Sequence, residues 1–67
     1  MSHLELHALA NRVRSEFIEM PGLRLTMPQA VRLWGLDVPV CRDVIDVLVR
    51  SEFLRWTPAG TIARIGG

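Results

Sequence analysis

The stretch TMPQAVRLWGLDVPVCRDVIDVLVR, at positions 26–50, constrains the fold of this 67-residue chain more than any other part of it. Thr26 and Gln29, three residues apart, have the pattern of a capping box, which begins a helix. Gly35 is suited to the left-handed backbone conformation that ends this helix. Asp37 then provides the N-cap of a second helix. The stretch therefore predicts two short helices joined by a tight turn.

The segment before this pair of helices predicts a longer helix and a short strand. From Leu4 to Phe17 the apolar residues recur at helical spacing, and the charged residues lie mainly on other faces. The MPG sequence at positions 20–22 ends the helix, because Pro disfavours a helical residue before it and Gly interrupts helices. LRLT at positions 23–26 alternates apolar and polar residues, which predicts a single short strand.

The segment after the pair predicts a β-hairpin. FLRWT at positions 53–57 and TIARI at positions 61–65 are strand-like, and the PAG between them supplies a turn. An isolated hairpin is only marginally stable, so we expect the strand at 23–26 to pair with it. The predicted order is helix, strand, helix, helix and hairpin, in a single domain of residues 1–67. This is an α+β fold class that is mainly α.

The composition predicts one small core without covalent cross-links. A chain of 67 residues holds one domain, and a chain of this size buries only about 60% of the surface that its unfolded form exposes. With one cysteine it can form no internal disulfide, and no Cys/His spacing typical of a metal site is present. The hydrophobic fraction of 49% is high for so small a chain, which indicates an interface with a partner or a second copy.

The spacing around Gly35 carries a resemblance to a known family. Leu36 follows this glycine directly, and Cys41 stands six residues after it. A steep turn between two helices needs the glycine, an apolar plug beside it, and a small buried residue where the backbones approach. With the predicted hairpin, the segment resembles a minimal bacterial winged helix-turn-helix domain, with the helix-turn-helix at 26–50 and the wing at 53–65.

Two departures from the family pattern bear on packing. Val31 stands where the family usually has Ala at the close helix contact, so the two helices are expected to lie slightly further apart. Ser51 and Glu52 replace a Gly that is common between the third helix and the wing. The chain is therefore expected to leave the third helix in a different way.

The resemblance implies a DNA-binding transcriptional regulator with double-stranded DNA as its partner. In winged helices that bind DNA, the third helix enters the major groove. Here Arg42 is the residue of that helix best suited to a guanine edge or a phosphate, whereas Asp43 and Asp46 would repel phosphates. Four further arginines would hold the DNA backbone if they fall on one side of the domain: Arg24, Arg32, Arg55 and Arg64.

An alternative on the same scaffold is a protein–protein interaction module with little or no DNA binding. The strand residues Arg55 and Arg64 would then be solvent-facing charges that discourage edge-to-edge aggregation. The third helix would present an apolar patch rimmed by its two aspartates. For the DNA-binding function, the first helix is instead expected to pair with a second copy, since a homodimer would place two third helices about one DNA turn apart. The candidate interface residues are Leu4, Leu9, Val38, Pro39, Val40 and Val47.

Several other residues admit both a functional and a structural interpretation. Trp34 and Trp56 could stack on bases, although large aromatic residues more often pack in a core or a hairpin. Cys41 could be a redox thiol, or a buried inert thiol at a helix-packing position. His3 and His7 could share a metal, but no third ligand has matching spacing, so a solvated and partly frayed first turn is the expectation.

The remaining sequence features argue against several classes of function. No Ser/His/Asp or Cys/His arrangement and no Gly-rich phosphate loop occurs, so we expect no enzyme, no cofactor and no metal. No apolar run is long enough to span a bilayer, and the start of the chain lacks a signal-peptide pattern, which predicts a cytoplasmic protein. The net charge of +1 lacks the strongly basic balance typical of non-specific nucleic-acid binding.

Overall fold

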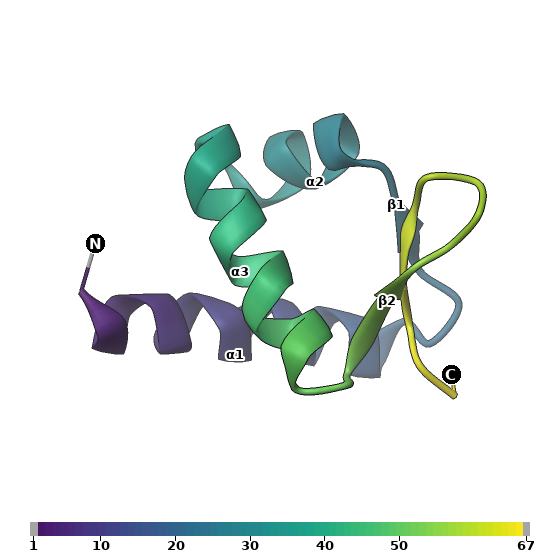
Figure 1. Cartoon of the computed structure of the whole chain (residues 1–67), viewed down its shortest axis with the longest axis horizontal. Coiled ribbons are helices and arrows are strands. Elements are labelled where there is room, and N and C mark those ends of the chain that lie inside the picture. Colours follow the sequence, from purple (N-terminus) through teal and green to yellow (C-terminus); the bar gives the residue numbers. More distant parts are fainter. Residues whose placement is uncertain (1, 67) are drawn as a thin grey trace.

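Three helices and a three-stranded antiparallel sheet form the chain in a computed structural model, which describes residues 2–66 (Figure 1). The element types and their order match the prediction, so the α+β, mainly α class is confirmed. Each predicted strand is shorter by one residue at either end, because only its central residues are paired. The elements are α1 (His3–Glu19), β1 (Arg24–Leu25), α2 (Met27–Trp34), α3 (Val38–Arg50), β2 (Leu54–Trp56) and β3 (Ile62–Arg64).

Local hydrogen bonds and backbone conformation determine where α2 begins and ends. The Gln29 N–H donates to the Thr26 hydroxyl at 3.3 Å, and the Thr26 N–H donates to the Gln29 side-chain oxygen at 2.9 Å. The predicted capping box is therefore confirmed. Gly35 ends the helix with φ 65° and ψ 33°, the left-handed conformation that was predicted for this turn.

The prediction for Asp37 is only partly right. Asp37 occupies the N-cap of α3, but its side chain makes no capping hydrogen bond. A capping side chain normally accepts from the N–H of the second or third helical residue. Pro39 is the second residue and has no N–H, so only the N–H of Val40 remains as a donor.

The sheet has the strand order β1–β3–β2, so the short strand β1 pairs with the hairpin as expected. Leu25 pairs with Ile62 in one row, and Arg24, Ala63 and Arg55 stand opposite one another in the next row. Successive side chains of a strand point to opposite faces, so the two rows lie on opposite faces of the sheet. Leu25 and Ile62 are buried and mark the inner face. The row of Arg24, Ala63 and Arg55 marks the outer face.

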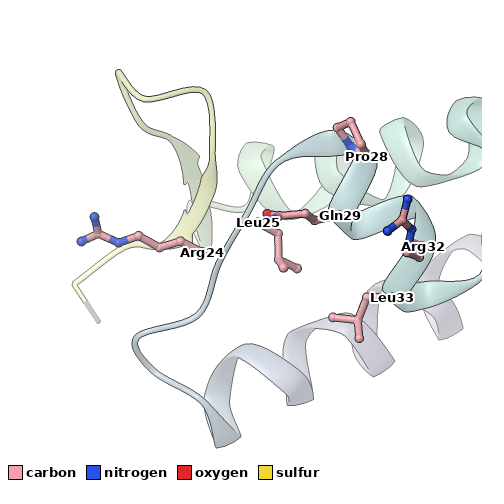
Figure 2. Close-up of a pocket in the computed structure, with 6 residues that line it drawn as sticks. All are labelled: Arg24, Leu25, Pro28, Gln29, Arg32 and Leu33. Atoms are coloured by element: carbon pink, nitrogen blue, oxygen red, sulfur yellow. The ribbon is translucent and has the colours of Figure 1, made fainter.

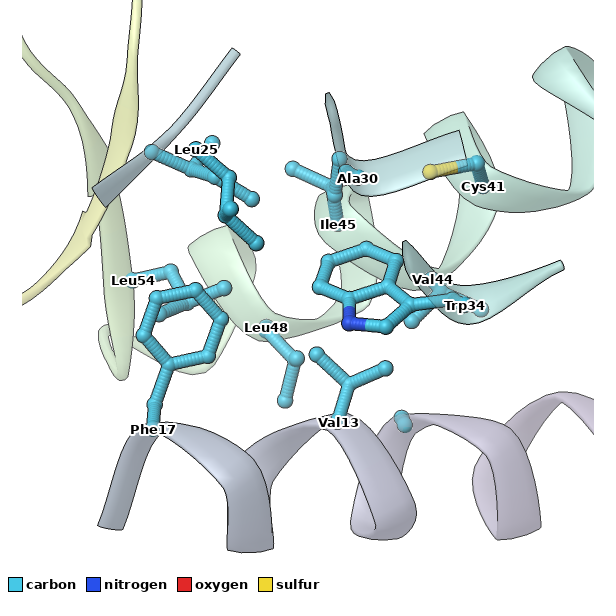
Figure 3. Close-up of a cluster of buried hydrophobic side chains, with 12 residues drawn as sticks. Val13, Phe17, Leu25, Ala30, Trp34, Cys41, Val44, Ile45, Leu48 and Leu54 are labelled. Atoms are coloured by element: carbon cyan, nitrogen blue, oxygen red, sulfur yellow. The ribbon is translucent and has the colours of Figure 1, made fainter. Parts of the chain in front are cut away.

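One apolar core lies between the helices and the inner face of the sheet (Figure 3). α1 crosses α3, and α2 and β2 pack against α3 (Figure 1). Trp34 is buried and stands edge-on to Phe17, with 6.5 Å between ring centroids, so its interpretation as a core residue is confirmed. The buried cluster is Ala10, Val13, Phe17, Leu25, Ala30, Trp34, Cys41, Val44, Ile45, Leu48, Leu54 and Ile62.

Two apolar side chains are less covered than the sequence pattern predicts. Leu33 of α2 is 52% exposed, because this helix turns its other apolar residues toward the core: Ala30 and Trp34 are buried, and Met27 and Val31 are partly buried. Trp56, expected to pack in the core or the hairpin, is 44% exposed. It is the last residue of β2, where the hairpin turn extends away from the helices (Figure 1).

The chain leaves α3 through a left-handed residue that is not glycine. Glu52 has φ 61°, and no other non-glycine residue has a positive φ in the described chain. The Ser51 hydroxyl and the Phe53 N–H both donate to the Leu48 carbonyl, at 3.1 Å and 3.0 Å. These bonds close the end of the helix around Glu52. The left-handed conformation costs an L-residue about 1–2 kcal/mol, so the departure from Gly leaves backbone strain at this junction.

Candidate nucleic-acid interface

Two arginines flank a small residue on the outer face of the sheet. Arg24 on β1 and Arg55 on β2 are both paired with Ala63 on the central strand, so the three side chains share one face. Adjacent strands lie about 4.8 Å apart, which puts the backbones of the two arginines about 10 Å from each other. Both arginines are exposed, and the alanine between them is too short to shield either one. The register of the sheet therefore places two free cations side by side.

A hollow of about 310 Å³ opens beside this row, and we call it the sheet hollow. Arg64 joins Arg24 and Arg55 in its lining. Three arginines and no acidic residue give the lining a formal charge of +3. The complete lining is Pro21, Gly22, Leu23, Arg24, Arg55, Ala63, Arg64 and Gly66.

The third arginine of the sheet hollow is held by an aromatic ring. The guanidinium carbon of Arg64 lies 5.6 Å from the centroid of Phe53, and that of Arg14 on α1 lies 5.2 Å from the same centroid. Such cation–π contacts orient a guanidinium while leaving its N–H groups available. Arg14 was not among the predicted site residues. Its contact with Phe53 depends on how α1 packs against the segment between α3 and β2, so the sequence spacing gives no signal for it.

A second hollow, which we call the α2 groove, lies between β1 and α2 (Figure 2). Its volume is about 540 Å³, and its charged residues are Arg24 and Arg32. Arg24 belongs to both hollows, so the four arginines predicted to hold a DNA backbone line two adjoining hollows. The lining of the α2 groove is Arg24, Leu25, Pro28, Gln29, Arg32 and Leu33.

The exposed side of α3 has a different balance of charge. Arg42 and Arg50 are matched by Asp43 and Asp46, so the charged residues of this helix sum to zero. Arg50 Nε lies 3.1 Å from Asp46 Oδ2, the one salt bridge among the described residues. Arg42, the predicted base contact, lines neither hollow. The structure therefore groups the other four candidate arginines but leaves Arg42 beside two acids.

The six apolar interface candidates divide into packed and open residues. Leu9 and Val47 are half-buried and pack against the core, so they present little surface to a partner. Leu4, at 81%, is the most exposed large apolar side chain among the described residues. Val38, at the start of α3, is 45% exposed. The candidates that keep open surface are Leu4, Val38 and Pro39, and Val40 is half-buried.

The structure supports a structural role for Cys41 and changes the interpretation of the histidines. Cys41 is buried, and burial raises the pKa of its thiol, which keeps it in the less reactive neutral form. His3 and His7 lie within α1 with their ring centroids 4.4 Å apart, and Ser2 caps this helix. The expected fraying is therefore not seen. Within the described part of the chain, no cluster of three or more His, Cys, Asp or Glu side chains could hold a metal ion.

No protein-family model, curated protein or solved structure matches the chain. In the region that the structure describes, no helix combines the length and the apolar character needed to cross a membrane. The sheet hollow brings Arg24, Arg55 and Arg64 together in one lining.

Proposed function

We propose that this chain is a winged helix-turn-helix domain that binds double-stranded DNA through the outer face of its sheet. The observation that carries the proposal is the sheet hollow, where Arg24, Arg55 and Arg64 stand together without an acidic residue in the lining. The winged-helix assignment is supported by the order of the elements and by the pairing of β1 with β3. At a promoter, such a domain would act as a small transcriptional regulator.

Three grouped guanidinium groups suit a phosphate backbone. Each group remains charged at any physiological pH and presents a planar fork of donors that matches phosphate oxygens. Arg24 and Arg55 project from the two strands that flank β3, whereas Arg64 is paired with the buried Leu54 and lies against the Phe53 ring at the edge of the same hollow. Neutralising three phosphates predicts that log K falls with log salt with a slope of about −2.7.

These contacts hold the DNA backbone and carry little sequence information. Arg32 at the far side of the α2 groove would add one backbone contact, and Arg42 on α3 is the candidate for a base edge. Asp43 and Asp46 would approach phosphates if α3 entered the major groove, which weakens that contact. We therefore expect modest, salt-sensitive affinity with a weak preference for sequence.

Fluorescence anisotropy with a short labelled duplex of random sequence tests the proposal. The Arg24→Ala/Arg55→Ala variant should bind at least about tenfold more weakly at low salt, and its salt slope should become shallower by about 1.8. Arg12→Ala/Arg50→Ala is the matched control, because it removes the same charge from exposed residues outside both hollows. If both variants lose the same amount of DNA affinity, or if the wild type does not bind at low salt, the outer face of the sheet does not bind DNA.

Protein binding through α3 is the second candidate function, and the exposed start of this helix favours it. Val38 is 45% exposed, its neighbour Pro39 is exposed, and the helix carries no net charge that would attract DNA. Pull-downs with genomic DNA fragments and with cell lysate separate the two functions. DNA recovery that depends on Arg24 and Arg55 supports the first function. Recovery of a protein that is lost with Val38→Glu, but kept with Arg55→Ala, supports the second.

A further inference from the structure

The α2 groove combines an apolar floor with two cationic ends, and the proposed DNA contact does not use that floor. Leu25 lies at its base, and Pro28 and Leu33 line its α2 side (Figure 2). Leu33 is 52% exposed, although leucine is favoured in a core. Arg24 and Arg32 stand at opposite ends of the groove (Figure 2). The groove is therefore an apolar surface without a partner inside its own domain.

The side chains around the groove do not fill it. Gln29 could lie over the floor, but its side-chain oxygen is held by the Thr26 N–H at 2.9 Å. Neither Arg24 nor Arg32 forms an ion pair with any residue in the described chain. A complementary occupant needs an apolar side chain next to a carboxylate. The apolar side chain would contact the apolar residues of the groove, and the carboxylate would pair with an arginine.

The same chain exposes such a pair at the start of α1. Leu4 is 81% exposed, and Glu5 follows it directly. Glu5 is also exposed and has no salt bridge in the part of the chain that the structure describes. The Glu5 N–H donates to the Ser2 hydroxyl at 3.1 Å, which holds this turn in helical form. The pair of side chains is therefore displayed on an ordered turn.

The start of α1 and the α2 groove match in residue order as well as in chemistry. Leu4 and Glu5 are consecutive residues of one helix, and Arg32 and Leu33 are consecutive residues of another. Consecutive residues of a helix point about 100° apart around its axis. When the two helices pack side by side in parallel, Leu4 can therefore face Leu33 while Glu5 faces Arg32. A single arrangement covers both exposed leucines and pairs the two charges.

These two surfaces lie apart within one molecule. The start of α1 is at the end of the domain opposite the sheet, whereas the α2 groove borders β1 (Figure 1). The longest dimension of the domain is 30 Å, and α1 runs along much of it. A contact between the two surfaces must therefore join two molecules.

We propose that the start of α1 in one molecule docks in the α2 groove of a second copy, with Leu4 against Leu33 and Glu5 against Arg32. Each molecule carries one docking turn and one groove, and in the arrangement that we propose a two-fold axis relates the two copies, so that both contacts form. Once the first contact forms, the second is intramolecular, which strengthens contacts that are weak individually. The interface is small, so the dimer is reversible. This association does not use the arginines of the sheet hollow, although its Glu5–Arg32 pair would occupy the arginine that adds a DNA-backbone contact from the α2 groove.

Two complementary variants test the dimer. Leu4→Glu removes the docking side chain, and Leu33→Glu places an acid on the α2 side of the groove. Both residues are exposed, so the fold should be retained. Analytical ultracentrifugation should show a concentration-dependent dimer for the wild type and at least tenfold weaker association for each variant alone. An equal mixture should associate again through one contact, because one variant keeps an intact groove and the other keeps an intact docking turn.

NMR spectra of the same mixture locate the contact. Unlabelled Leu33→Glu protein should shift the groove amide signals of isotope-labelled Leu4→Glu protein, and unlabelled Leu4→Glu protein should not. A wild type that stays monomeric at its highest soluble concentration overturns the proposal. So does a dimer that Leu4→Glu disrupts and Leu33→Glu leaves intact, because the α1 helices would then pair with each other.

A charge exchange tests the ionic part of the contact. Glu5→Arg and Arg32→Glu should each weaken the dimer, because each places two like charges against each other. The double variant should recover most of the wild-type association, since the two charges are opposite again. If the double variant is as weak as the single variants, Glu5 does not face Arg32 and the proposed orientation is wrong.

Discussion

The outer face of the sheet and the exposed side of α3 both carry arginines, but the two regions arrange them differently. On the sheet, Arg24 and Arg55 flank Ala63, and no acidic residue lines the hollow beside them. On α3, Arg50 lies 3.1 Å from Asp46. The family resemblance directs attention to the helix. The free positive charge lies instead where separate strands are brought together.

The difference shows how two kinds of neighbour set the charge of a surface. On a helix, residues four positions apart are neighbours, so the sequence of α3 places its own acids beside its own arginines. Across a sheet, neighbours come from distant parts of the chain, so cations can gather without an intervening acid. A helix of zero net charge and a sheet hollow of charge +3 can therefore occur in a chain with a net charge of only +1.

The largest expected effect on DNA affinity comes from reversing the charge of the two arginines on the outer face of the sheet. Arg24→Glu/Arg55→Glu should lower DNA affinity by at least about 30-fold at low salt, because two phosphate contacts become repulsive. Arg42→Glu on α3 should lower it by less than about fivefold, since solution ions screen a more distant charge. Electrophoretic mobility shifts with a random-sequence duplex measure both. A greater loss for Arg42→Glu would move the DNA contact to α3.

Neutralising an acidic residue of α3 should have a smaller effect on DNA affinity. Asp43→Asn should raise DNA affinity by no more than about threefold, because salt screens charges that lie beyond the DNA contact. Asp43 is a better choice than Asp46, whose removal would also release Arg50 from its ion pair. Binding at two salt concentrations checks the expectation. A tenfold gain that disappears at high salt would place α3 against the phosphates.

The junction between the two regions gives the smallest expected effect, and this effect is on stability. Glu52 holds φ 61° between α3 and β2. Glu52→Gly should raise the free energy of unfolding by about 0.5–1 kcal/mol, because relief of left-handed strain exceeds the entropy that glycine adds to the unfolded chain. Ser51→Gly is the control and should lower this free energy, since Ser51 has φ −83° and donates to the Leu48 carbonyl.

Urea denaturation of both glycine variants measures this difference, and DNA affinity should stay the same in each. A less stable Glu52→Gly protein would mean that the Glu52 side chain makes a contact that outweighs its backbone strain.

Local features of the fold could be predicted from the sequence, whereas exposure could not. The capping box at Thr26 and the left-handed Gly35 depend on residues a few positions apart, so a short pattern is sufficient. Leu33 and Trp56 have the same apolar character as the core residues. Their exposure depends on how far the neighbouring elements reach, which is a property of the packed domain.

The candidate site shows the same division. The sequence identifies the arginines as basic residues on several elements, but the register of the sheet decides that Arg24 and Arg55 are neighbours. A shift of one residue would turn a strand's arginine to the other face. The approach of Arg14 to Phe53 likewise depends on the packing of α1 against the segment between α3 and β2. The residue types were therefore predictable, and their grouping required the tertiary structure.

Mapping the DNA contact onto backbone amide signals by NMR is the most direct test of the sheet-face proposal. Addition of a short duplex to isotope-labelled protein should shift the signals of Arg24, Arg55 and Gly66 around the sheet hollow. The signals of Val38 and Arg42 on α3 should change little. If the α3 signals shift and those around the sheet hollow do not, the outer face of the sheet is not where this domain binds DNA.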